Sequence, residues 1–392
     1  SGGTAPEGPF MPLQRPSTTW RDHYNPLRGL TMARIVAMED AAERGQHADL
    51  QWFYHYMERV DVTVQAAIAR RLAFIDSLDW EIRTVEGADP YLAQDQSDLL
   101  RYAYERIDNL KQAAHDLGRA LFRGFCLLEK IPTGYGSLVS RLDTIPQWYW
   151  VQDRPSGVWR FNPESKSNEL RGELVPRSHF VAFEATPLNR AIGRQFFAKQ
   201  LAFADWDTAL EAGANQSIFI FGPPGTQPDK EQEYRAVAEQ IASNGRGYLP
   251  NGSDVKSFDP AARSRLPYLE RIDYCDKQIV LAATGGLLNM LTEGGSGTLA
   301  GGAHAESLLD LAKSDAARLT EAFQRDLDKE WLTDFFPRQP HVAYFAFDVP
   351  QRADFSAIME AVGNLSWSGY RINQQQLEEK TGLKLERMET PS

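Results

Sequence analysis

The segment from residue 293 to 302 constrains the fold most, because it concentrates glycine between two stretches of helical periodicity. Five of the nine residues after Glu293 are glycine. Glycine at this density predicts a loop, since glycine readily adopts positive φ angles and loses much entropy when it is ordered. Apolar residues recur every three or four positions before the segment, at 268–291, and after it, at about 305–336. The chain therefore has to place a glycine loop between two long helices.

The N-terminal part of the chain predicts an arm, then helices, then antiparallel strands. Residues 1–30 are rich in Pro, Gly, Ser and Thr and lack apolar periodicity, which is typical of an extended arm. We expect Thr31 to cap a helix, one long helix over 50–78 and another over 99–121, with an alternating strand at 79–85 between them. Short aromatic and β-branched runs across 124–184 predict a meander of antiparallel strands.

The middle of the chain predicts a small α/β module between two helices. Apolar spacing indicates a helix at 187–213 and another at 268–291. Between them come a strand at 217–221, a helix at 230–241 and one or two further strands at 248–258. After the helix at 305–336, one strand at 341–347 and a short helical tail end the sequence.

Composition narrows the class of protein. The 392 residues are 42% hydrophobic and 24% charged, which is ordinary for a chain with a buried core. The net charge of -11 argues against a protein that grips nucleic acid with a basic surface, although it does not exclude one that surrounds DNA. We find no run of about 18 apolar residues and no secretion signal, so no membrane span is expected. Cys126 and Cys275 are too few for a disulfide framework and are expected to be buried thiols in a reducing compartment.

Motifs that suggest catalysis are incomplete. Gly222-Pro-Pro-Gly-Thr226 resembles the start of an ATPase phosphate loop, but Pro228 follows where the loop needs an amide donor and Lys230 is out of register. The glycines of 295–301 lack the preceding strand of a dinucleotide-binding motif. His304 with Glu306 is the one metal candidate, and a helix start explains the pair better. We therefore predict no catalytic residue, metal or cofactor.

Several motifs, taken in order from about residue 21 to 385, resemble the portal proteins of Mu-like phages, which are head–tail connectors. The motifs are Arg21-Asp-His-Tyr-Asn-Pro-Leu-Arg-Gly-Leu-Thr31, Asp61 with Arg70-Arg71 and Ala73, Trp80-Glu-Ile82, Asp273-Tyr-Cys-Asp-Lys-Gln-Ile279, Gly285 to Thr292, Gly294-Gly-Ser-Gly297, Ala300-Gly-Gly302 with His304, and Ser314-Asp-Ala-Ala-Arg-Leu319.

The resemblance implies an α+β portal-type fold with named parts. After the arm at 1–30 these are a wing of helices and antiparallel strands at 31–184, a stem helix at 185–216, a β-α-β clip at 217–265, a second stem helix at 266–292, a tunnel loop at 293–303, a wing helix and strand at 304–349, and a short C-terminal crown at 350–392.

The resemblance also implies a non-enzymatic function. Such a chain forms a homo-oligomeric ring, expected to be a dodecamer, at the head–tail vertex of the virion, and it is made in the host cytoplasm. Double-stranded DNA is packaged and ejected through the ring, which docks the terminase large subunit and later a neck or adaptor protein, and contacts the major capsid protein. The tunnel loop residues that would face DNA are Gly294, Gly295, Ser296, Gly297, Thr298, Gly301 and Gly302, and the clip residues that would meet the motor or adaptor are Lys230, Glu231, Glu233, Arg235 and Arg246.

Two other classes of protein stay open at the level of sequence. One is another phage structural adaptor or scaffold protein without a DNA channel, which shares the long helices but does not predict their order around the α/β module. The other is an ATP-using enzyme built on the loop at 222–226. Nucleotide hydrolysis or a nucleotide-dependent melting shift would favour the enzyme.

Overall fold

The structure is a computed structural model that describes residues 12–13, 29–164, 172–214, 218–221, 230–244, 254–257, 267–286 and 298–348. Of the expected parts, most of the arm, the loop at 222–229, residues 287–297 and the crown at 350–392 lie outside these ranges.

Helices make up more of the described chain than strands. The α-helices are α1 (Met32–Glu43), α2 (Ala48–Val60), α3 (Val62–Asp76), α4 (Pro90–Glu105), α5 (Leu110–Gly118), α6 (Ala120–Arg123), α7 (Asn189–Ala214), α8 (Glu231–Asn244), α9 (Tyr268–Thr284), α10 (Thr298–Phe323) and α11 (Lys329–Phe335), with a π-helical turn η6 (Gln324–Asp328) joining the last two. The strands are β1 (Asp79–Thr84), β2 (Phe125–Pro132), β3 (Val139–Thr144), β4 (Trp150–Asp153), β5 (Val158–Phe161), β6 (Glu173–Leu174), β7 (Phe180–Glu184), β8 (Ile218–Phe221), β9 (Asp254–Ser257) and β10 (Ala343–Asp348).

The long helix expected over 50–78 is two helices, and this prediction was wrong. The chain leaves the helical conformation at Asp61, which has φ -99° and ψ 119°. Its Oδ1 accepts a hydrogen bond from the backbone N–H of Val64 at 3.0 Å and so caps α3. Apolar spacing continues through the break, which hides it in the sequence. The cap expected at Thr31 is confirmed, because its Oγ1 accepts from Arg34 N.

The helix expected over 99–121 is also interrupted, and α4, α5 and α6 replace it. The cause of the first break is the neighbouring strand β3. Asn109 exchanges two hydrogen bonds with the backbone of Leu142, at 2.7 and 3.0 Å, and Asp108 N donates to Ser140 O. These bonds hold the connection between α4 and α5 against the edge of β3, so the helix cannot continue.

The antiparallel meander expected at 124–184 is confirmed as two three-stranded sheets, with strand orders β3-β2-β7 and β4-β5-β6. Strand β2 lies between two cores, because its side chains alternate. Cys126 and Leu128 belong to the main core, which the helices share, and Phe125 and Leu127 belong to a smaller aromatic core with Trp150 and its neighbours.

The two helices around the glycine segment have different ends from those expected. Helix α9 ends at Thr284, where Gly285 has φ 71° and forms the left-handed cap, so Gly285 and Gly286 do not extend it as predicted, and the predicted residues 287–291 lie outside the described ranges. Helix α10 begins at Thr298 instead of about 305, so the last residues assigned to the loop are helical. Ala and Leu at 299, 300 and 303 favour helix enough to accommodate Gly301 and Gly302.

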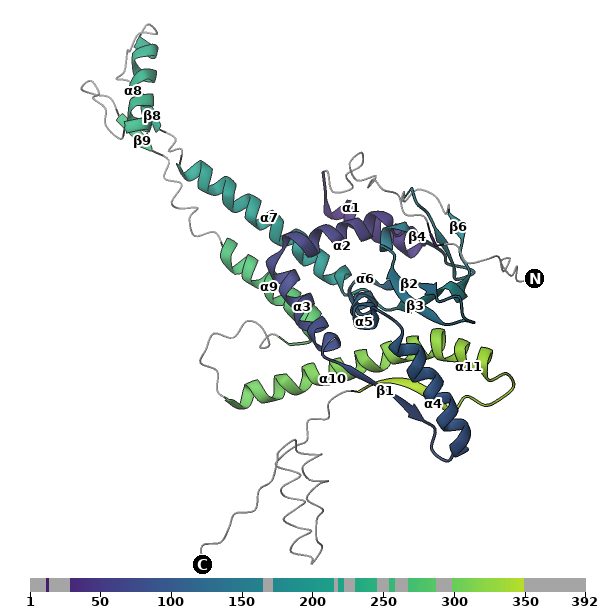
Figure 1. The fold of residues 1–392 in the computed structure, drawn as a ribbon. Coiled ribbons are helices and arrows are strands. Elements are labelled where there is room, and N and C mark those ends of the chain that lie inside the picture. Colours follow the sequence, from purple (N-terminus) through teal and green to yellow (C-terminus); the bar gives the residue numbers. More distant parts are fainter. Residues whose placement is uncertain are drawn as a thin grey trace, which may run out of the picture.

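The elements form a body with one long projection (Figure 1). Helices α7 and α9 pack side by side, extend away from the body and carry the module β8-α8-β9 at their far end. Within that module β8 pairs antiparallel with β9. Helix α10 crosses the opposite part of the body and continues through η6 into α11. Among the described helices, none combines the length and the apolar character needed to span a bilayer.

Candidate functional site

The projecting pair α7 and α9 exposes large apolar side chains. The six on these helices that are more than a third exposed are Leu201, Phe203, Leu210, Leu269, Tyr274 and Leu281. Leu269 and Leu210 are 65% and 60% exposed. A pair of helices that already buries its facing sides has no need of such residues on its outer sides. The projection therefore carries exposed apolar side chains on both of its helices.

The first half of α7 is fixed to the body by charged groups. Arg194 donates to Glu39 of α1 at 2.6 Å, and Arg190 donates to Glu39 and Glu43. The Glu39 carboxylate is 2% exposed, so these contacts lie at the edge of the packed interface and not in open solvent. The apolar residues Ile192 and Phe196 enter the main core from the same turns of α7.

Glu58 of α2 is the centre of a buried network at the start of α7. Its carboxylate accepts from Arg123 at 2.6 Å, from Arg119 at 2.7 Å and from Asn189 Nδ2 at 2.7 Å. Burial alone would raise the pKa of Glu58, but the charge and hydrogen bonds of Arg123, the charge of Arg119 and the Asn189 hydrogen bond outweigh it and lower the pKa to about 2. The glutamate is therefore ionised at neutral pH and holds α2, α6 and α7 together.

Lys199 joins the projection to the helix break at Asp61. Its Nζ lies 2.9 Å from Asp61 and 2.6 Å from Asp276 of α9, and its side chain is 8% exposed. Burial alone would lower the pKa of Lys199, but the two aspartates raise it. The residue that caps α3 thus also binds α7, so the break in the N-terminal helices and the position of the projection depend on each other.

The π-helical turn η6 lies between the edges of two sheets and accepts hydrogen bonds from the backbone of both. Asp326 accepts from the backbone N–H of Ala182 in β7 at 2.9 Å, and Asp328 accepts from that of Phe345 in β10 at 2.7 Å. Residues two apart on a helix point to opposite sides, which is why one turn can reach both strands. Tyr104 Oη donates to Asp328 at 2.6 Å. Burial raises the pKa of Asp328 to about 6, and no cation contributes to that pKa.

The raised pKa of Asp328 predicts an unusual pH dependence. The folded-state pKa of about 6 lies above the ordinary value of 3.8, so the folded chain takes up this proton first as the pH falls. Wild-type stability relative to an Asp328→Asn variant should therefore rise by about 2 kcal/mol as the pH falls from 6 to 4, and be lost again as the pH rises. Denaturant unfolding of both proteins at pH 7.5 and 4.5 measures the difference. A difference independent of pH would contradict the assignment.

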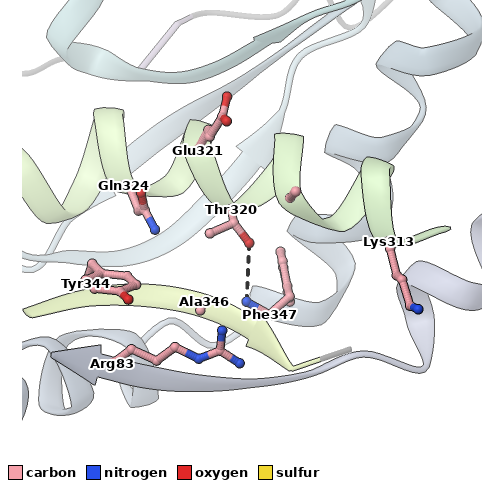
Figure 2. A pocket seen from close by; sticks show the side chains of 9 residues that line it. Arg83, Lys313, Thr320, Glu321, Gln324, Tyr344, Ala346 and Phe347 are labelled. Atoms are coloured by element: carbon pink, nitrogen blue, oxygen red, sulfur yellow. Dashed lines mark hydrogen bonds between the residues drawn. The ribbon is translucent and has the colours of Figure 1, made fainter. Parts of the chain in front are cut away.

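A groove of about 470 Å³ lies between α10 and the β1–β10 sheet, where Arg83, Tyr344 and Lys313 are among the lining residues (Figure 2). Polar side chains in the groove already form hydrogen bonds to the backbone of β10 along its free edge. Thr320 Oγ1 accepts from the backbone N–H of Phe347, and Gln324 Nε2 donates to Phe345 O. Asp328 of η6 accepts from the backbone N–H of the same Phe345. The groove is therefore best explained as the seam between helix and sheet.

A second hollow, of about 290 Å³, lies between α1, α2 and the start of β2. His47, Gln51 and Tyr54 are among its lining residues, and each has one buried polar atom without a hydrogen-bond partner among the described residues. Burial, and then the charge of Arg154, lower the pKa of His47 to about 3, so its ring is neutral. Polar hollows of this size hold water.

Helix α8, in or next to which four of the five clip residues predicted from the sequence fall, lies at the tip of the projection, far from α10 (Figure 1). Lys230 directly precedes α8, and Lys230, Glu233 and Arg235 are exposed there. Glu231 is in α8, and Arg246 lies outside the described residues.

Of the predicted tunnel loop, Gly294, Gly295, Ser296 and Gly297 lie outside the described residues. Thr298, Gly301 and Gly302 are in the first turns of α10, which corrects their placement in a loop. His304 and Glu306 fall in the same helix. Across the described residues no group of three or more His, Cys, Asp or Glu side chains could hold a metal ion. Cys126 and Cys275 are free and buried, as expected.

The sequence was not sufficient to find the charged residues that fix the projection. Glu58 and Lys199 occupy helical patterns in which charge ordinarily indicates a solvent-facing side. Asp61 and Arg71 are in one of the motifs quoted above, but the motif carried no role for either residue. Buried ion pairs between distant segments leave no local signal.

The fold and its projecting helix pair can now be compared with known proteins. The profile of the family described as "Portal protein of Mu bacteriophage" matches residues 51–383. The chain belongs to this family. A curated relative, the Mu-like prophage FluMu protein gp29 of Haemophilus influenzae, is 26% identical over 398 residues, covering 96% of this chain and 74% of the relative. Portal proteins are structural components of the virion, which fits the expected non-enzymatic role.

Solved structures agree with the portal fold. A chain in the virion of the native gene transfer agent (GTA) particle has a TM-score of 0.53 at 13% identity, covering 84% of this chain and 92% of its own length. A chain in the neck of the native GTA particle computed with C12 symmetry has a TM-score of 0.50 at 13% identity, covering 82% and 90%. At these identities the likeness shows the fold, and the α+β portal-type fold expected from the sequence is confirmed.

Proposed function

We propose that this chain is one protomer of a portal ring at the capsid vertex, through which double-stranded DNA is packaged and ejected. The observation that supports it best is the projecting pair α7 and α9, fixed to the body at one end, carrying β8-α8-β9 at the other and exposing apolar side chains along its length. Membership of the Mu portal family links this shape to the function of a portal.

The parts of the portal are assigned as follows. The N-terminal arm is 1–30, the wing is 31–184 with 304–349, the stem helices are 185–216 and 266–292, the clip is 217–265, and the crown is 350–392. The tunnel loop assigned to 293–303 includes the first turns of α10. The proposed stem contains α7, which covers Asn189–Ala214, and α9, which covers Tyr268–Thr284.

Ring assembly would use the apolar surface of the stem. In a closed ring, one face of each protomer meets a different face of its neighbour. The exposed leucines of α7 and α9 fit such a contact, because neighbouring stems would bury them. A neck structure with C12 symmetry among the similar solved structures favours a dodecamer.

The channel would let DNA pass without holding it. Lysine and arginine lining a channel would displace counterions and retain the phosphates, whereas the chain's net charge of -11 disfavours tight binding. We assign the narrowest point to Gly294, Gly295, Ser296 and Gly297 with the adjoining turns of α10, including Thr298, Gly301 and Gly302. Glycine-rich backbone adjusts to a passing duplex because it packs little.

The clip would face the packaging motor and later the neck. Lys230, Glu233 and Arg235 are exposed at the tip of the projection and suit polar contacts with the terminase large subunit or an adaptor protein. Glu231 and Arg246 are proposed for the same surface. The ring would contact the major capsid protein, reside at the head–tail vertex after synthesis in the host cytoplasm, and work without a catalytic centre, metal or cofactor.

Shortening the glycine segment tests the channel assignment. Removing residues 294–297 should leave ring assembly intact, because the stem surface is unchanged, and should reduce the DNA retained in filled particles several-fold. The amount of packaged DNA is measured by quantitative PCR after nuclease treatment, with wild-type particles beside it. Normal DNA packaging and retention with the shortened chain would contradict the assignment of this segment to the channel.

A further inference from the structure

Arg71 of α3 makes three hydrogen bonds to two other helices. Its Nε and Nη2 donate to the two carboxylate oxygens of Asp315 in α10, at 2.8 and 3.1 Å. Its Nη1 donates to the backbone oxygen of Ala283 in α9, at 2.8 Å. The side chains of Arg71 and Asp315 are 11% and 4% exposed. One guanidinium thus contacts the end of the second stem helix and the middle of the long wing helix.

The contact with α9 is at the helix terminus. Ala283 is the residue before the last in α9, so its carbonyl has no partner within the helix. A cation at this end also interacts favourably with the helix dipole. The end of α9 packs closely on α10, because a Cβ on Gly285 would lie 2.9 Å from Leu311 Cδ1. Arg71 therefore holds α9 where α10 passes it.

Arginine is the side chain that this geometry requires. Its planar guanidinium can bind a carboxylate with two parallel hydrogen bonds and still direct a third donor elsewhere. The lysine ammonium cannot span both partners in this way. The pairing with Asp315 joins α3 to α10, and the third bond adds α9, so removing the guanidinium breaks the hydrogen-bonded link among the three helices while their packing remains.

We propose that Arg71 is a positioning residue that couples the second stem helix α9 to the wing helix α10, so that the two helices flanking the channel segment move together when DNA passes. The coupling of α9 to α10 is argued from the contacts described above. Its effect on DNA passage rests on the proposed function. A rival account is that the ion pair only stabilises the wing, in which case stability alone would change.

Two variants separate these accounts. Arg71→Gln removes the charge and the bidentate contact, and Arg71→Lys keeps the charge but loses the geometry. Arg83→Gln is the matched control, because Arg83 lies on the exposed β1 strand and forms its ion pairs with Glu81 and with Asp348 of β10. Hydrogen–deuterium exchange on assembled rings reports on the amides of 280–286 and 310–316. DNA retention in filled particles reports on the channel.

The coupling predicts that both Arg71 variants assemble into rings and accelerate exchange at 280–286 and at 310–316 together by about tenfold or more, as expected for loss of charged hydrogen bonds. DNA retention should fall several-fold, with Arg83→Gln unchanged. Exchange that rises in one helix only, or retention equal to wild type, would overturn the proposal. So would failure of both Arg71 variants to assemble, since Arg71 would then be needed for folding as a whole.

Failure of the proposed function gives a different result. If wild-type rings retain no DNA, or no rings form, the portal assignment is wrong. The exchange measurement on the full chain would still decide whether Arg71 couples α9 to α10.

Discussion

Replacing Glu58 with alanine is expected to lower the free energy of unfolding by about 3–5 kcal/mol, because it leaves the buried guanidinium of Arg123 without its carboxylate. Arg123 is 4% exposed and Glu58 is 6% exposed. Asn189 at the start of α7 loses its hydrogen bond in the same change. The shift of the denaturant-unfolding curve at one fixed protein concentration measures the effect, since assembly also contributes to stability.

The matched control is Glu43→Ala. Glu43 pairs with Arg190 at 2.7 Å, but its side chain is 62% exposed, so the loss should be about 0–1 kcal/mol. If the two variants shifted the curve equally, burial of the network around Glu58 would not be the reason for its contribution.

Introducing aspartate at Leu201 and Leu269 together is expected to abolish ring formation while leaving the protomer folded. Both leucines are more than half exposed in the protomer, at 51% and 65%, so the substitutions remove little from its core. In a ring each interface would contain an unpaired buried charge, which costs several kcal/mol and weakens each contact by at least about a hundredfold. Mass measurement and sedimentation of the purified variant determine the assembly state.

The control for this double substitution is Leu174→Asp. Leu174 is 49% exposed and lies on β6, away from α7 and α9. Leu174→Asp makes the same leucine-to-aspartate change on a different surface and should leave the rings intact. Rings formed equally well by the stem variant would show that α7 and α9 do not make the subunit contact.

The sequence predicted the parts of the fold whose apolar periodicity is continuous and unbroken. The helix predicted at 187–213 is α7, and the strand, helix and strand that follow are β8, α8 and β9. The paired strands at 79–85 and 341–347 were also located, although their pairing as β1 and β10 needs contacts across the whole chain. Apolar periodicity and turn residues are local signals, so each of these elements could be predicted from its own segment of the sequence.

The interruptions could not be predicted in the same way. Asp61 ends a helix in the middle of a continuous apolar stripe, because its carboxylate caps α3 and binds Lys199 from α7. The π-helical turn at Gln324–Asp328 places Asp326 and Asp328 against two different sheets. Both features depend on partners outside the helix, Lys199 for Asp61 and the backbones of Ala182 and Phe345 for the π-helical turn, so no pattern within the helix marks them.

The candidate site was predicted in outline and missed in its chemistry. The resemblance placed the stem helices, the clip and the glycine segment in their order along the chain. It assigned no role to Glu58, Lys199 or Arg71, which link the stem to the wing: Lys199 by its buried ion pair with Asp61, and Glu58 and Arg71 by hydrogen bonds to Asn189 and to the backbone of Ala283. Such pairs form only when segments distant in sequence meet, and in the sequence the charges look like ordinary surface residues.

Electron microscopy of the purified full chain is the most direct test that many copies surround a common channel. Closed rings should appear, with the stem pairs of α7 and α9 packed around a central opening and the β8-α8-β9 modules together at one end. A chain that stays monomeric or dimeric under all solution conditions, with the stem pair standing free, would contradict the account.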